Sequence, residues 1–298
     1  MARKDEYETT EYPGIKKRIK DGKYLAVLYT DFHPREGKSG GAWMTEFKPQ
    51  WMEKDGTNSR PHISIVMNFT RPTENEPSLL TFDELTTFLH EFGHALHGLL
   101  SDVPYESLSG TNVYRDFVEL PSQIMENFAS LPEFLNKTAI HYETGEVIPA
   151  ELVNKLKASE QYLAAYSCIR QLSFGYLDMA WHGITEAFDG NVIEFEKNAW
   201  KKTQLFPSID GCCMSTHFTH LFAGGYAAGY YGYKWAEVLD ADAFSVFQEA
   251  GGINAEVASR FRENILSKGS TKHPMTLYKA FRGSAPKTDA LLKRDGIK

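Results

Sequence analysis

The sequence predicts a mainly α-helical fold with a small β-sheet near its N-terminus. Residues 61–69 alternate apolar and polar side chains, which is the period-two pattern of a strand. From Thr81 onward, apolar residues recur instead at the three- and four-residue spacing of helices. At 298 residues the chain can bury a sizeable core. We therefore expect a single domain over 1–298, in which a sheet region at 20–70 precedes a helical region at 81–298.

Two β-rich segments form the expected sheet. Residues 24–32 are rich in side chains that favour strands, and residues 61–69 supply the alternating strand. The glycine-rich stretch 37–41 between them predicts a turn. Helix dominates strand in the rest of the chain, where helical patterns cover 82–100, 112–130, 150–188, 218–239 and 255–266.

Composition excludes several classes of protein. The 32 basic and 39 acidic residues give a net charge of −7, which argues against a protein that grips phosphate backbones, so we expect no nucleic acid partner. Three cysteines, Cys168, Cys212 and Cys213, form no readable disulfide framework and favour a reducing, cytoplasmic location. Residues 1–12 hold no apolar export segment, and no apolar run is long enough to cross a bilayer. We therefore expect no membrane association.

The helix expected at 82–100 carries the strongest functional signal. Thr81 and Glu84 form a capping box that starts it, and its sequence at 90–94 is His-Glu-Phe-Gly-His. Residues four apart share a helix face, so His90 and His94 can present their imidazoles to one metal ion with Glu91 beside them, which is the HExxH arrangement. The alternative is a polar helix face with histidines that have ordinary hydrogen-bond partners. His97 lies one turn beyond and is expected to pack rather than to bind metal.

A catalytic zinc ion takes three protein ligands and keeps one open position, so a third ligand is needed. Glu119 is the candidate, because it lies on a polar helical face with Asp116 and Gln123. Pro121 should kink this helix close to Glu119. Asp116 could orient a ligating histidine. By spacing alone, Glu119 could equally be a solvated surface carboxylate.

Three segments closely resemble the thimet oligopeptidase and peptidyl-dipeptidase family of zinc metallopeptidases. They are HEFGHALH at 90–97, SGTNV at 109–113 and RDFVELPSQ at 115–123. The segments YTDFHPR at 29–35, GGAWM at 40–44 and HLFAGGYAAGYYGY at 220–233 also resemble the family, so the similarity runs from Lys23 to the C-terminus. The resemblance implies a zincin-like catalytic domain that holds one zinc ion per chain. The implied ligands are His90, His94 and Glu119, with Glu91 as the general base.

Three tyrosines, Tyr226, Tyr230 and Tyr233, follow a helical spacing downstream. By spacing alone, such a stripe is more often core packing. Peptide hydrolysis, however, creates an oxyanion that a phenol or imidazole beside the metal can stabilise. The resemblance implies this role for His220, Tyr226 and Tyr233, and a substrate contact for Tyr230.

Short peptides are the implied substrates, and the mode of cleavage has two candidates. The segment FRGSAP at 281–286 resembles the bacterial peptidyl-dipeptidases, which favours release of C-terminal dipeptides over cleavage inside the peptide. Arg282 is a candidate to bind the substrate's terminal carboxylate. An ordinary ion-pairing arginine is the simpler interpretation of this residue. The strand at 63–69 could bind the substrate backbone as an added strand, or it could be a buried sheet strand.

The chain departs from the family in length. Family members carry a large helical N-terminal region that forms the opposite wall of a substrate channel, and this chain resembles only their C-terminal, catalytic part. We therefore expect an exposed apolar surface where that wall would pack. The missing region is a possible partner, and a zinc-binding but inactive catalytic fragment is the alternative to an active enzyme.

Overall fold

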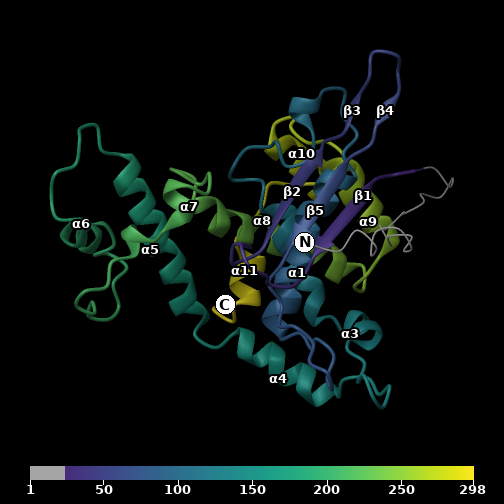
Figure 1. The fold of residues 1–298 in the computed structure, drawn as a ribbon, viewed down its shortest axis with the longest axis horizontal. Helices are drawn as coiled ribbons and strands as arrows, with labels where there is room; N and C mark the ends of the chain where they lie inside the picture. The colour runs from purple at the N-terminus through teal and green to yellow at the C-terminus, as the bar shows by residue number, and fades with distance from the viewer. Residues whose placement is uncertain (1–23) are drawn as a thin grey trace.

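The computed structural model describes residues 24–298, and the expectations for residues 1–23 lie outside this part of the chain. Figure 1 shows a sheet and a group of helices in one body, from which a second group of helices extends. The strands are β1 (Val27–Asp31), β2 (Trp43–Lys48), β3 (Trp51–Met52), β4 (Asn58–Ser59) and β5 (His62–Val66). The helices are α1 (Phe82–Leu99), α2 (Leu120–Glu126), α3 (Pro132–Thr138), α4 (Ala150–Glu160), α5 (Ala164–His182), α6 (Val192–Ala199), α7 (Thr219–Phe222), α8 (Tyr231–Glu249), α9 (Ala255–Phe261), α10 (Pro274–Arg282) and α11 (Asp289–Arg294).

The expected sheet is present and has three strands in the order β1-β5-β2. β5 pairs in parallel with β1 and antiparallel with β2, and Met67 and Phe69 continue the pairing toward residues 31 and 32. Both edges of β5 are therefore occupied. The expectation that the strand at 63–69 receives substrate is wrong for this reason, and its alternative, a buried sheet strand, holds. β2 lies at the edge of the sheet, with one side unpaired within the described residues.

α1 lies between the sheet and the remaining helices of the body (Figure 1). Ile63, Ile65 and Met67 of the sheet region pack against Ala95 and Leu99 of α1. The opposite side of α1 meets α2, which packs in turn on α8. A larger apolar core joins α2 and α8 to α9 and α10. The zinc-motif helix is thus held on two sides by buried contacts.

Several expected helices differ from the observed ones. The segment 112–130 is helical only from Leu120, because Pro121 occupies the first turn, where its missing N–H is no loss, and so it starts a helix rather than kinking one. The segment 150–188 divides into α4 and α5 at Leu163, whose φ is 56°. The segment 218–239 divides into α7 and α8, with Gly225 at φ 79° and Ala228 at φ 53° between them. The three tyrosines therefore do not share one helix.

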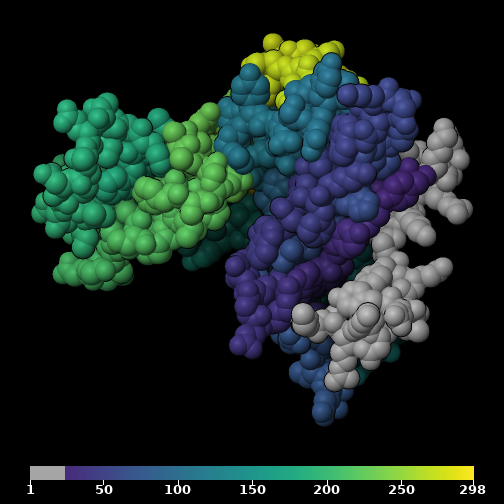
Figure 2. Space-filling view, turned by 45° about the horizontal axis from the view of Figure 1, so that its top comes forward, coloured from purple at the N-terminus to yellow at the C-terminus, as the bar shows by residue number. Residues whose placement is uncertain are grey.

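α5, α6 and α7 form an arm that extends from the body (Figures 1 and 2). Its own small core is built from Leu177, Phe218 and Leu221 with surrounding aromatic side chains. The three cysteines are free. Within residues 24–298, every helix is too short or too polar to cross a membrane.

Candidate metal centre

α1 presents two imidazoles on one face. Thr81 accepts a hydrogen bond from the backbone N–H of Glu84, and the Glu84 carboxylate accepts one from the N–H of Thr81, so the expected capping box is present. With the start of the helix fixed in this way, His90 and His94 lie one turn apart, and their ring centroids are 5.0 Å from each other.

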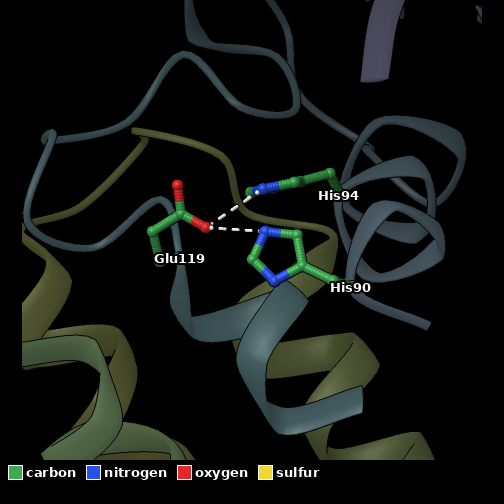
Figure 3. Close-up of side chains that lie close together, drawn as sticks. All are labelled: His90, His94 and Glu119. Atoms are coloured by element: carbon green, nitrogen blue, oxygen red, sulfur yellow. Dashed lines mark ion pairs between the residues drawn. The ribbon is translucent and has the colours of Figure 1, made fainter. Parts of the chain in front are cut away.

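Glu119, at the start of α2, faces both imidazoles (Figure 3). Its Oε2 atom lies 3.2 Å from Nε2 of His90 and 3.1 Å from Nε2 of His94, and the residue is 1% exposed. Burial alone would lower the pKa of His90, but the carboxylates of Glu119 and Glu126 raise it to about 10. The surroundings therefore favour positive charge at this point.

These three side chains fit a zinc ion. Their ligand atoms all lie within 4.8 Å of one another, and two imidazole nitrogens with one carboxylate oxygen form a donor set that catalytic zinc uses. Among residues 24–298 this is the one cluster of three or more such side chains. Three protein ligands also leave a fourth position open for water or substrate.

Glu91 lies beside the ligands in a cavity of about 450 Å³. The residue is 7% exposed, and burial raises the pKa of its carboxyl above the ordinary value. The cavity brings together the helix α1, the edge strand β2 and the glycine- and tyrosine-rich segment before α8. Its lining residues include Met44, His90, Glu91, His94, Arg115, Glu119, His220, Tyr226 and Tyr233.

Tyr226 reaches the centre from the segment between α7 and α8, and Tyr233 reaches it from the first turn of α8. The hydroxyl of Tyr226 donates a hydrogen bond of 2.5 Å to Oε1 of Glu119, the carboxylate oxygen that faces away from the histidines. The ring of Tyr233 stacks on Tyr226 with centroids 4.9 Å apart, and His220 lies 5.8 Å from Tyr226 and 6.2 Å from Tyr233. The chain thus places two phenols and an imidazole next to the candidate ligands.

Comparison with known proteins identifies the family of this chain. A model of peptidase family M3 matches residues 6–297. The chain belongs to peptidase family M3. Oligopeptidase A of Escherichia coli is 44% identical over 91% of the chain, and dipeptidyl carboxypeptidase of Salmonella typhimurium is 41% identical over 93%. Among solved structures, PZ peptidase A with an inhibitor has the same fold, with a TM-score of 0.54 at 18% identity over 90% of the chain and 42% of that chain.

The match to these M3 relatives covers only part of them. The chain spans 40% of the length of the Escherichia coli enzyme and 41% of that of the Salmonella enzyme. Membership in family M3 confirms the resemblance drawn from the sequence motifs. The expected fold, mainly helical with a small sheet near the N-terminus, is confirmed as well.

The histidine-orienting carboxylate of this M3 chain differs from the expected one. Oε1 of Glu126 lies 2.6 Å from Nδ1 of His90, whereas Asp116 accepts a hydrogen bond from the hydroxyl of Tyr231. The expectation for Asp116 is therefore wrong, because its side chain is directed toward α8. Glu126 lies two turns after Glu119 along α2, and this seven-residue spacing is the signal that could have identified it.

Two expected substrate contacts do not line the cavity. Tyr230 packs between Phe174 and Phe218, with ring centroids 5.7 and 5.0 Å away, in the core of the arm. Arg282 lies on α10, where its Nε is 3.3 Å from a carboxylate oxygen of Asp242. His97 is fully buried, as expected for a packing residue.

Sequence reasoning also missed a second cavity at the metal centre. A neighbouring cavity of about 540 Å³ shares Ala42, His90 and Glu91 with the first, so the hollow continues across the metal centre. Gly41, Asn68 and Phe69 line it from the sheet side. An extended peptide therefore has space on both sides of the candidate ligands.

Proposed function

We propose that this chain hydrolyses peptide bonds in short peptides with one bound zinc ion, and that it releases C-terminal dipeptides. The observation that carries the proposal is the cluster of His90, His94 and Glu119 beside the buried Glu91 in one cavity. Membership in peptidase family M3 supports a metal-dependent peptidase. The resemblance of residues 281–286 to bacterial peptidyl-dipeptidases supports the dipeptide-releasing mode.

Zinc bound by the three ligands would polarise a carbonyl group and lower the pKa of water to about 7. Glu91 then takes the proton of the attacking water and delivers it to the leaving amine. Its burial suits this role, because a raised carboxyl pKa brings it closer to the pKa of the groups it exchanges protons with. We propose that Tyr226, Tyr233 and His220, which line the same cavity, donate hydrogen bonds to the developing oxyanion; Tyr226 would do so by releasing its hydrogen bond to Glu119.

The edge strand β2 supplies a surface for the substrate backbone. Ala42, Trp43 and Met44 line the same cavity as the ligands, and within residues 24–298 β2 pairs with β5 on one side only. The backbone N–H of Met44 lies close enough to the carboxylate of Glu91 to lower its pKa. This edge of β2 is therefore directed toward the site. A peptide that lies along β2 as an added strand would carry its scissile bond past the ligands.

The proposal is tested by zinc content and product analysis of the purified chain. We expect about one zinc ion per chain, chelator-sensitive release of C-terminal dipeptides from a defined oligopeptide, and no release by Glu91→Ala. Mass spectrometry of the products separates the alternatives. Internal cleavage would indicate an endo-acting oligopeptidase, and zinc without cleavage would indicate a catalytic fragment that needs an N-terminal region. A folded chain that binds no zinc would overturn the proposal.

We further propose a cytoplasmic location, which is supported by the three free cysteines. The cavity at the site and the membership in a peptidase family support short peptides as partners. We also propose that a region like the unmatched part of these longer relatives is a partner of this chain.

A further inference from the structure

Arg115 is the one lysine or arginine that lines either cavity at the metal centre. The ion pairs among residues 24–298 do not include it, and no hydrogen bond of its guanidinium to these residues is formed. A cation without a carboxylate partner therefore lies in the hollow where the substrate is proposed to bind.

The position of Arg115 is built into the fold. Its guanidinium carbon lies 4.8 Å from the ring centroid of Tyr226. A Cβ atom at residue 229 would lie 2.9 Å from Cγ of Arg115, and one at residue 225 would lie 3.6 Å from its Nη2. Gly229 thus leaves room for the arginine to lie along this segment, whereas the contact at residue 225 is an ordinary van der Waals one. The aromatic ring supports the guanidinium while its N–H groups remain available.

The contacts of Tyr226 set an upper bound on the distance from Arg115 to the metal ligands, and two residues of an extended peptide can span it. The guanidinium lies over Tyr226, whose hydroxyl is 2.5 Å from Glu119. These two contacts lie at opposite ends of the Tyr226 side chain. Together with the distance from the ring centre to the hydroxyl, they place the guanidinium within about 10 Å of the Glu119 carboxylate. Two extended residues span about 7 Å, and a charge-assisted hydrogen bond adds about 3 Å.

We propose that Arg115 binds the C-terminal carboxylate of the substrate, two residues beyond the cleaved bond. The inference rests on the proposed peptidase function and deepens it, since it assigns the group that selects a free C-terminus. A planar guanidinium pairs with a carboxylate through two parallel hydrogen bonds. Arg115 is a specificity-determining residue in this proposal, and it takes the role first considered for Arg282.

The test compares two forms of one hexapeptide, with a free C-terminal carboxylate and with a C-terminal amide. The zinc-loaded full chain is expected to prefer the free acid by roughly 10- to 100-fold in kcat/KM. Arg115→Met keeps the aliphatic stem and removes the charge, so it should lose this preference mainly through a higher KM for the acid. Arg115→Lys should restore part of it. Arg170→Met is the matched control, because Arg170 also lies over aromatic rings, at 4.5 Å from Phe174, but in the arm.

Binding of the same two peptides to the zinc-loaded Glu91→Ala chain, measured by calorimetry, decides the matter even if the chain does not cleave. The proposal is supported if adding Arg115→Met to the Glu91→Ala chain weakens binding of the free-acid peptide and leaves binding of the amide peptide unchanged. An unchanged ratio of acid to amide in folded, zinc-loaded Arg115→Met overturns it. Equal handling of both peptides by the wild-type chain also overturns it but leaves peptide hydrolysis intact. Failure to cleave either peptide counts against the proposed function alone.

Discussion

His90 lies between two carboxylates. Its Nε2 faces Glu119 and its Nδ1 faces Glu126, at 3.2 and 2.6 Å. A ligating imidazole binds metal through one nitrogen, and a partner on the other nitrogen fixes both the tautomer and the ring orientation. Glu126 is therefore a positioning residue for the proposed zinc site.

We predict that Glu126→Ala lowers the affinity for zinc by about 10- to 100-fold, because the His90 ring loses its fixed orientation. Competition with a chelator of known affinity measures this change without reference to activity. Asp116→Ala is the matched control, since this carboxylate contacts Tyr231 instead, and its zinc affinity should stay within about twofold of wild type. A loss of affinity in Asp116→Ala with none in Glu126→Ala would contradict the assignment.

Glu46 is a second carboxylate whose surroundings are unusual. On β2, its Oε1 atom lies against Gly98 and Gly110 and has no hydrogen-bond partner in the described part of the chain. Burial raises its pKa from 4.5 to about 7. The folded state therefore binds more protons than the unfolded state between these two pH values, so this residue's contribution to stability falls as the pH rises from about 4.5 to about 7.

Glu46→Gln should remove this pH dependence. The melting temperature of the variant minus that of wild type should be at least about 2 °C larger at pH 8 than at pH 5. The reason is that only the wild type must bury a charge at the higher pH. Melting curves of zinc-saturated proteins at both pH values measure the difference. The exposed Glu36→Gln serves as the control and should give a constant difference. A Glu46→Gln difference that stays flat or falls with pH would exclude a buried, raised-pKa carboxyl at this position.

At the scale of elements, the spacing between metal ligands depends on the approach of α1 to α2. A Cβ atom at Gly93 would lie 2.2 Å from the carbonyl oxygen of Pro121 and 2.6 Å from Cα of Ser122. Both contacts are with backbone, which cannot turn aside as a side chain can. Gly93 thus allows the helix that carries both histidines to touch the helix that follows Glu119.

Gly93→Ala is predicted to lower the free energy of unfolding by about 2–3 kcal/mol and to weaken zinc binding, because the helices must separate. Urea unfolding and chelator competition measure the two effects. Gly175→Ala on α5 is the matched control: nothing lies within 4 Å of its Cβ position, so the substitution should stabilise the chain by about 0.5–1 kcal/mol through helix propensity. Equal stability of the two variants would mean that α1 and α2 are not in backbone contact.

The sequence predicted best those elements whose signals are local. The capping box at Thr81 marked the start of α1, and the four-residue spacing of its histidines is a property of any helix. The break between α7 and α8 depends on Gly225 and Ala228, whose positive φ angles a helical pattern does not reveal. Glu119 needed the family resemblance, and Arg115 and Glu126 were missed as site residues because their partners lie on other segments of the chain.

At the scale of the whole molecule, the arm of α5, α6 and α7 carries apolar side chains on its surface. Leu172, Tyr176 and Met179 follow a helical spacing along α5 and are each between 43% and 52% exposed. Further exposed apolar residues of the arm are Tyr166, Ile184, Phe188, Leu205, Phe206, Ile209 and Phe222. Exposed apolar side chains gathered in one part of a molecule are typical of interfaces.

The isolated chain is therefore predicted to associate with itself as its concentration rises, since apolar side chains on the arm lose contact with water when two copies meet. Light scattering at increasing concentration measures the mass directly. Leu172→Glu combined with Met179→Glu should shift the chain toward the monomer, because each copy would then present charge on this stripe of α5. Ser167→Glu combined with Thr185→Glu adds the same charge at exposed polar positions of the arm and should leave association unchanged. A wild-type chain that stays monomeric at every concentration, or an equal response of the two double variants, would show that the α5 stripe is not an interaction surface.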